Sequence, residues 1–351
     1  MENSSTTTEI IFTSHLEEEL ERLLAGYPAN RIFLATESNV NRLWLDNHPF
    51  FRSYPGVVIP AGEENKQVTS ATAIWNFLSE SGADRKSLLV NVGGGMLTDL
   101  AGFAASTFKR GIAFINIPTT LLSQVDASVG GKTGFNLRGL KNEIGTFTEP
   151  RAVLIDPRFL GTLDRENFLS GYAEMIKHGL IAHPGHLQDL EAYDTEKVDP
   201  GTLLPIIRQS VEIKNSFVVR DPREKGIRKA LNFGHTTGHA IESLAMEQGR
   251  PLLHGFCVAW GMIAELFLST RVCGFPEKET HRISQWISHL FGKFPLSPGH
   301  FEQLITLMGH DKKNEAGGIN FTLVSAPGLI EIDKYCGREE ILDALAYLNT
   351  F

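Results

Sequence analysis

The first 165 residues alternate between short apolar runs and longer segments in which apolar side chains recur at helical spacing. The longer segments predict amphipathic helices at 63–81 and 96–108. Because short strands that alternate with helices are typical of a parallel sheet with both faces covered, this half predicts a Rossmann-like α/β domain. The short apolar runs predict its strands at 31–36, 57–59, 87–92, 113–117 and 152–155.

The hydrophobic pattern changes near residue 165, after which helical periodicity dominates. The exception is a pair of strand-like runs at 319–324 and 329–332, which predicts a hairpin because Pro327 and Gly328 stand between them. We therefore predict two domains, an α/β domain at 1–165 and a mainly α-helical domain at 166–351. The helices of the second domain are predicted at 166–182, 200–219, 229–247, 254–273, 277–291, 299–309 and 339–348.

Composition and charge narrow the class of protein. The chain has 351 residues, of which 42% are hydrophobic, and this suits two folded domains. The formal net charge is −8 without a basic tract, so nucleic acid is not an expected partner, although a local basic cluster could bind a small anion. Three scattered cysteines indicate a reducing, cytosolic environment. No signal peptide and no apolar run long enough to span a membrane are expected.

Three consecutive glycines, Gly93 to Gly95, join the predicted strand at 87–92 to the predicted helix at 96–108. Glycine lets a ligand approach the backbone, and a helix N-terminus offers N–H groups, so this arrangement can bind a pyrophosphate. The usual G-x-G-x-x-G spacing is absent, and a tight strand-to-helix turn explains the glycines equally well. Asp99 either stabilises the helix N-terminus or contacts a cofactor hydroxyl. Three more polar residues follow strand ends, where parallel sheets bind ligands: Asn39, Glu63 and Lys66.

Charged residues gather between residues 109 and 142, in an otherwise apolar region. The residues Gly130 to Thr133 resemble the end of a P-loop, but Ala127 stands where the first glycine belongs, so nucleotide hydrolysis is not indicated. A charge run is usually a solvated surface, but glycine and asparagine are interleaved here, which favours an anion site. The polar members are Lys109, Arg110, Asp126, Lys132, Lys141 and Asn142.

The strongest chemical signal lies at 228–239, where His235 and His239 are four residues apart and share one face of a predicted helix. Such a pair is more often structural than metal-bound, but Glu174 and His254 occur in neighbouring predicted helices. One carboxylate with two or three imidazoles is a zinc-type ligand set, and three protein ligands leave a position open for substrate. Further polar residues at helical spacing from these are Lys177, Arg228 and Asn232.

Together these motifs resemble the 3-dehydroquinate synthase family, from about residue 30 to residue 325. The order and spacing of so many motifs make the resemblance specific. Two motifs depart from the family pattern: Met96 to Thr98 replace a common Val-Ile-Gly, and Thr237 replaces a common apolar residue, but neither change removes a chemical group. The matching motifs are 93–95 with Asp99, 118–122, 125–126, 130–132, 141–142, Glu174 with Lys177, 232–235, 238–239, 253–255 and 311–313.

The resemblance implies a dehydroquinate synthase-like fold and a lyase of the shikimate pathway, which leads to aromatic amino acids. The implied reaction converts 3-deoxy-D-arabino-heptulosonate 7-phosphate to 3-dehydroquinate and phosphate. NAD⁺ bound by the first domain would oxidise a substrate hydroxyl and later return the hydride. Zn²⁺ or Co²⁺ in the second domain would polarise that hydroxyl. The family further implies a homodimer that binds a small anionic sugar phosphate. The cysteines suggest that it is cytoplasmic, and the charge and hydropathy of the chain predict neither nucleic acid nor membrane as a partner.

The resemblance also implies a role for individual residues. The metal ligands would be Glu174, His235 and His254, which leaves His239 to substrate binding and proton transfer. The expected substrate-binding residues are Arg110, Asp126, Lys132, Asn142, Lys177, Lys214, Arg228, Asn232, His239 and Lys312. Of these residues, four are expected to bind the substrate phosphate: Arg110, Lys132, Asn142 and His239. Three are expected to bind its carboxylate and hydroxyl groups: Lys214, Arg228 and Asn232. The sequence does not separate Lys312 from Lys313. The residues expected to line NAD⁺ are Glu37, Asn39, Glu63, Lys66, Gly94, Gly95, Asp99, Thr119, Thr120, Lys141 and Thr162.

The sequence is also compatible with three other functions. Metal-dependent alcohol and glycerol dehydrogenases share the fold resemblance but need no phosphate site, so the density of lysine and arginine disfavours them. Another sugar phosphate cyclase could act on a substrate that lacks a carboxylate. A non-catalytic scaffold would be expected to have lost part of the metal or charge set, and all of it is present.

Overall fold

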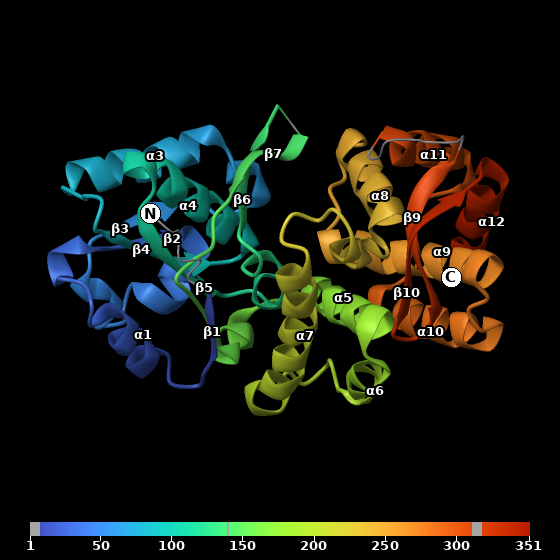
Figure 1. Ribbon diagram of the computed structural model, residues 1–351, viewed down its shortest axis with the longest axis horizontal. Coiled ribbons are helices and arrows are strands. Elements are labelled where there is room, and N and C mark those ends of the chain that lie inside the picture. Colours follow the sequence, from blue (N-terminus) through green and yellow to red (C-terminus); the bar gives the residue numbers. More distant parts are fainter. Residues whose placement is uncertain (1–7, 139, 311–317) are drawn as a thin grey trace. The chain divides into compact units, whose positions relative to one another are not determined.

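The computed structural model describes residues 8–138, 140–310 and 318–351, which form two compact units (Figure 1). The first unit comprises Met1–Leu163 and Val198–Arg208, and the second comprises Asp164–Lys197 and Gln209–Phe351. Each unit has its own core of buried apolar side chains.

The first unit is built on a six-stranded sheet with the strand order β1-β8-β5-β4-β2-β3. All of its strand pairings are parallel, as the sequence predicts. The buried strands carry apolar side chains on both faces, which explains why they read as continuous apolar runs. The strands are β1 (Glu9–Phe12), β2 (Ile32–Glu37), β3 (Gly56–Ile59), β4 (Leu88–Gly93), β5 (Ala113–Pro118) and β8 (Ala152–Ile155).

Helices cover both faces of this sheet, and Figure 1 shows α3 and α1 on opposite sides of it. One core packs Ile74 and Leu78 of α3 and Leu100 of α4 against the sheet, and the other packs Leu20 of α1 against the opposite face. The sequence does not predict β1 or the antiparallel hairpin of β6 (Lys132–Leu137) and β7 (Leu140–Phe147). The helices are α1 (Leu16–Leu24), α2 (Ser38–Val40), α3 (Val68–Glu80) and α4 (Gly95–Thr107).

The second unit is mainly helical, and the predicted hairpin is present as β9 and β10. Helix α9 is its central element, because α5, α8, α10, α12 and β9 all pack against it. The elements are α5 (Arg165–Ala182), α6 (Pro184–Ala192), α8 (His235–Glu247), α9 (His254–Cys273), α10 (Glu277–Phe291), α11 (Phe301–His310), β9 (Ile319–Ala326), β10 (Leu329–Cys336) and α12 (Arg338–Leu348). Helix α7 (Pro200–Arg220) contributes its residues from Gln209 onward.

Helix α9 corrects one expectation from the sequence. Its 20 residues have a mean hydropathy of 1.4 over the most apolar window, so by length and composition it could cross a membrane. However, 67% of that window is buried against other elements of the second unit. An all-round apolar helix is what the centre of a helical core requires, and this packing accounts for its composition.

Helix α6 places one histidine in this core. The His186 side chain is fully buried, and its Nδ1 lies 3.1 Å from Oε1 of Gln209. Burial disfavours the charged imidazolium and lowers the pKa of His186 to about 4.

Acidification is therefore expected to destabilise the protein through His186. Its folded-state pKa lies below the ordinary value of 6.5, so the unfolded chain binds the proton first as the pH falls. The stabilising contribution is complete above pH 6.5, is lost toward pH 4 and amounts to roughly 3 kcal/mol at most. Urea unfolding at pH 7 and pH 4.5 should show a larger loss for the wild type than for His186→Gln. Equal losses would contradict this assignment.

Candidate functional site

The glycine turn of the first unit has the predicted arrangement. Strand β4 ends at Gly93, Gly94 is the N-cap residue of α4, and the helix begins at Gly95. A Cβ atom at Gly94 would lie 3.0 Å from Cγ2 of Thr120, and the N–H of Thr119 donates to the Gly93 carbonyl at 3.0 Å. A side chain at Gly94 would crowd Thr120 where the ends of β4 and β5 meet, and glycine there leaves the helix N-terminus uncovered.

A buried lysine links the sheet edge to the β6–β7 hairpin. The Lys66 side chain is 4% exposed, and its Nζ donates to Asp99 Oδ2 and to Asn142 Oδ1, both at 2.6 Å. Burial alone would lower the pKa of Lys66, but Asp99 and Glu63 outweigh burial and raise it, so the lysine is charged. Asn142 adopts a φ of 53°, and its N–H donates to Asn136 Oδ1 at 2.9 Å.

This cluster brings together residues from both halves of the predicted set. Lys66 and Asp99 are predicted to line NAD⁺, whereas Asn142 is predicted to bind phosphate. Asn142 is therefore held by Lys66, which also contacts Asp99. Glu63 lies beside the cluster and accepts from Asn136 Nδ2 at 2.9 Å.

The other predicted residues of the first unit have varied surroundings. The Glu37 carboxylate caps α2 by accepting from the N–H groups of Asn39 and Val40 at 2.8 and 2.9 Å. Thr162 accepts from Trp44 Nε1 at 2.9 Å. Arg110 lies in the turn between α4 and β5 and is exposed. The other three residues lie between β5 and β8, where Asp126 is partly buried and Lys132 and Lys141 are exposed.

The second unit holds the predicted carboxylate and imidazoles together. Nε2 of His235 lies 3.4 Å from Oε1 of Glu174, and Nε2 of His254 lies 3.5 Å from the same oxygen. The rings of His235 and His254 are 5.3 Å apart, and that of His239 is 5.2 Å from His235 and 5.8 Å from His254. Histidines His235 and His239 therefore share one face of α8, as the spacing predicts.

Two glycines allow this convergence. A Cβ atom at Gly255 would collide with the carbonyl oxygen of Ser170, so only glycine lets the start of α9 lie against α5. A Cβ atom at Gly261 would collide with the carbonyl oxygen of Gly234, which brings α9 equally close to the start of α8. Because His254 begins α9 and His235 begins α8, these approaches bring both imidazoles to Glu174 on α5.

The charges in the cluster depend on its burial and on the charged groups that its members contact. Burial alone would raise the pKa of Glu174, but its ion pair with Lys177 and the two imidazoles hold the pKa well below the usual value. Burial and Lys177 lower the pKa of His235 to about 4, so it is neutral. Burial would also lower the pKa of His254, but Glu174 and Glu242 raise it to about 10. A metal ion that binds here must displace the proton of His254.

The donor set fits a divalent metal ion. Glu174 is fully buried, and among the described residues neither of its oxygens has a hydrogen bond of normal geometry. A buried carboxylate without such hydrogen bonds, facing two imidazole nitrogens, suits zinc or cobalt coordination. One ring nitrogen each of His235, His239 and His254 lies within 4.8 Å of the other two. His239 is therefore close enough either to bind the same metal ion or to contact a molecule bound to it.

Four predicted substrate residues belong to the second unit, as Glu174, His235 and His254 do. Lys177 and Lys214 are buried, and Arg228 is 2% exposed, its Nη1 donating to the carbonyl of Pro222 at 2.8 Å. Asn232 donates from Nδ2 to Oε1 of Glu224 at 3.1 Å. Buried lysine and arginine side chains are unusual in a structural core and are suited to an anionic ligand. Lys312 and Lys313 lie outside the described residues.

Two buried glutamates near the cluster are absent from the sequence prediction. Glu242 lies seven residues after His235 and therefore on the same face of α8. Glu265 lies eleven residues after His254, three turns along α9. These spacings are the signal in the sequence that could have identified both residues.

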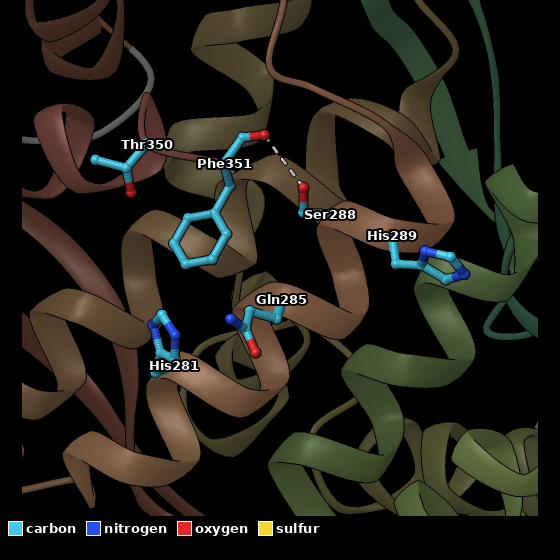
Figure 2. A pocket seen from close by; sticks show the side chains of 6 residues that line it. All are labelled: His281, Gln285, Ser288, His289, Thr350 and Phe351. Carbon is cyan, nitrogen blue, oxygen red and sulfur yellow. Dashed lines mark hydrogen bonds between the residues drawn. The ribbon is translucent and has the colours of Figure 1, made fainter.

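The second unit also carries a surface hollow, shown in Figure 2. Ser288 Oγ donates to the carbonyl of Phe351 at 3.2 Å, and the His281 ring lies 5.8 Å from that of Phe351. No lysine, arginine or predicted site residue is among its lining residues, so it does not suit a phosphate ester. The lining residues are His281, Gln285, Ser288, His289, Thr350 and Phe351.

A parallel sheet with a glycine turn, together with a buried glutamate–histidine cluster, defines an enzyme class that uses a nucleotide cofactor and a divalent metal. Sequence comparison specifies the family. Residues 56–170 match the family described as 3-dehydroquinate synthase N-terminal, and residues 171–314 match 3-dehydroquinate synthase C-terminal. A 3-dehydroquinate synthase of Parabacteroides distasonis is 46% identical over 341 residues, covering 96% of this chain and 97% of the relative. The chain belongs to the 3-dehydroquinate synthase family.

Solved structures agree with this family. A 2-epi-5-epi-valiolone synthase from Streptomyces hygroscopicus subsp. jinggangensis, with NAD⁺ and Zn²⁺ bound, has a TM-score of 0.87 and 25% identity and covers 100% of this chain and 99% of that one. A 2-deoxy-scyllo-inosose synthase complexed with carbaglucose-6-phosphate, NAD⁺ and Co²⁺ has a TM-score of 0.83 and 25% identity, covering 96% of this chain and 95% of that one.

Proposed function

We propose that this protein is a 3-dehydroquinate synthase, a lyase that converts 3-deoxy-D-arabino-heptulosonate 7-phosphate to 3-dehydroquinate and phosphate in the shikimate pathway. The observation that carries the proposal is the 46% identity to a 3-dehydroquinate synthase over 96% of the chain. The convergence of Glu174, His235 and His254 supports it, because it supplies the donors that the reaction requires.

We assign the cofactors to separate units. The first unit would bind NAD⁺ at the N-terminus of α4, with Lys66 and Asp99 beside it. Glu174, His235 and His254 of the second unit would hold Zn²⁺ or Co²⁺. When bound, NAD⁺ supplies reversible hydride transfer and the metal supplies a Lewis acid.

Side chains of both units would bind the substrate and balance its negative charges. Lys177 neutralises Glu174 within the buried cluster, so a second negative group can approach without full repulsion. We assign the substrate carboxylate and hydroxyl groups to Lys214, Arg228 and Asn232 of the second unit. We assign the phosphate to Arg110, Lys132, Asn142 and His239. Asp126 and Lys312 complete the proposed substrate set, and the remaining NAD⁺ contacts are Glu37, Asn39, Glu63, Gly94, Gly95, Thr119, Thr120, Lys141 and Thr162.

Two alternative functions are disfavoured for different reasons. A metal-dependent alcohol or glycerol dehydrogenase would need no site for an anionic substrate, yet Lys214 and Arg228, which we assign to the substrate carboxylate and hydroxyl groups, are buried in the second unit. The 2-epi-5-epi-valiolone synthase and the 2-deoxy-scyllo-inosose synthase have this fold, but each is 25% identical to the chain, against 46% for the 3-dehydroquinate synthase. We also propose that the protein is cytoplasmic and homodimeric, as its three free cysteines and its family suggest.

Purified protein with zinc and NAD⁺ is expected to release phosphate from 3-deoxy-D-arabino-heptulosonate 7-phosphate without net accumulation of reduced nicotinamide. The cofactor is reoxidised in each turnover, so its absorbance returns to the starting value while phosphate accumulates. Phosphate assay and nicotinamide absorbance in the same sample test this. Stoichiometric accumulation of reduced cofactor would indicate a dehydrogenase, and no phosphate release would refute the proposed substrate.

A further inference from the structure

His254 makes contacts through both of its ring nitrogens. Its Nε2 faces Glu174 Oε1 at 3.5 Å, and its Nδ1 faces Glu242 Oε2 at 3.4 Å. Glu242 is 5% exposed and comes from α8, whereas His254 begins α9. A carboxylate beside Nδ1 favours a proton on that nitrogen, which leaves the Nε2 lone pair available to a metal.

His235 is oriented in a different way. Its Nδ1 lies 3.1 Å from the backbone carbonyl of Phe233, so the same tautomer is favoured and Nε2 again faces Glu174. This contact lies within the turn that leads into α8, so the ring direction depends on the conformation of that turn. Gly234, the N-cap residue of α8, has a φ of 80° and provides no side-chain cap.

Glu265 holds this turn from the neighbouring helix α9. Its Oε2 accepts from the N–H of Gly234 at 2.6 Å, and its Oε1 accepts from the N–H of Thr237 at 3.0 Å. Glu265 is fully buried, and its carboxylate lies at the positive end of α8. The two bonded N–H groups flank His235 on either side along the chain. One carboxylate therefore fixes the backbone that carries this donor.

We propose that Glu242 and Glu265, which are not metal ligands themselves, are positioning residues for the two histidine donors. Glu242 sets the tautomer and ring direction of His254 through its side chain, and Glu265 sets the position of His235 through its backbone. This inference rests on the proposed metal site of Glu174, His235 and His254. It extends that site to a second layer of two buried carboxylates.

The first test measures zinc affinity by competition with a chromophoric chelator, in the full-length protein without substrate. Glu242→Ala removes the acceptor and is expected to weaken zinc binding by about ten- to a hundredfold. Glu242→Gln keeps a neutral acceptor of the same size, so its affinity should lie between those of wild type and Glu242→Ala. If Glu242→Ala does not fold, Glu242→Gln alone must bind zinc more weakly than wild type.

The second test replaces Glu265 by glutamine, whose amide can accept only one of the two N–H groups and turns a donor toward the other. Zinc affinity is expected to fall by roughly tenfold, and the absorption bands of the cobalt-loaded protein should shift because His235 moves. The matched control is Glu247→Gln, since Glu247 also lies on α8 but pairs with Gln303 at the surface.

The outcomes separate the inference from the proposed function. If wild type does not bind zinc, the metal site itself is wrong. If wild type binds zinc and the variants of Glu242 and Glu265 bind it as tightly as Glu247→Gln, the proposed positioning is wrong. A lower melting temperature with unchanged zinc affinity and cobalt spectrum would mean that both glutamates serve only the stability of the fold, and would likewise overturn the inference.

Discussion

Replacing Glu174 by glutamine is expected to remove the bound metal and to lower turnover by about a thousandfold or more, because metal stabilisation of the reacting oxygen contributes several kcal/mol. The glutamine fits the same buried space but loses the negative charge that both imidazoles and Lys177 face. Metal content by elemental analysis and phosphate release measure the two effects.

Glu166→Gln is the matched control, since Glu166 lies in the first turn of the same helix and is exposed. The variant at position 174 also leaves Lys177 buried without its charged partner, so its melting temperature should fall and activities must be compared per folded protein. Chelation of wild type should abolish activity, and zinc or cobalt should restore it. Full activity in a verified metal-free sample would defeat the metal hypothesis.

The parallel sheet was predictable because its central strands are buried on both faces. Strand β4, for example, is buried at every residue, so its sequence has no polar alternation to confuse it with a surface segment. The edge strand β1 has only four residues, of which one is exposed and the others are partly buried, so its apolar run is too short to stand out. Strand β6 contains a charged and a glycine residue among few apolar ones, which conceals its pairing with β7.

The candidate site was predictable where chemistry and spacing coincide. The pair His235 and His239 needs only the helical period to share a face, and the glycine turn needs only a strand followed by a helix. The contact of Asn142 with Lys66 depends instead on a φ of 53° at position 142 and on the unpredicted β6–β7 hairpin. The spacing along α9 can mark Glu265 as a candidate, but its bonds to backbone N–H groups of α8 follow from the packing of the two helices and not from a residue pattern.

Replacing Arg228 is the second substitution that we expect to lower turnover strongly. Arg228 lies in the turn Ile227–Asn232 before α8 and is 2% exposed. Its Nη1 donates to the carbonyl of Pro222 at 2.8 Å, and its backbone N–H donates to Asp221 Oδ2 at 3.1 Å. The contact with Asp221 fixes the backbone at this position, and the contact with Pro222 holds the guanidinium, which reduces the cost of ordering it when an anion binds.

Arg228→Lys is expected to lower turnover of the carboxylate substrate by roughly tenfold or more, since one charged hydrogen bond contributes about 1.5–3 kcal/mol. Lysine keeps the charge but cannot give a carboxylate two parallel N–H donors. Zinc content and NAD⁺ affinity should stay near wild type, because the proposed metal ligands and glycine turn are unchanged. The control is Lys229→Arg, whose side chain pairs with Asp333 at 2.8 Å and is 34% exposed. Normal turnover, or loss of metal, would refute the carboxylate assignment and favour a cyclase for a sugar phosphate without a carboxylate.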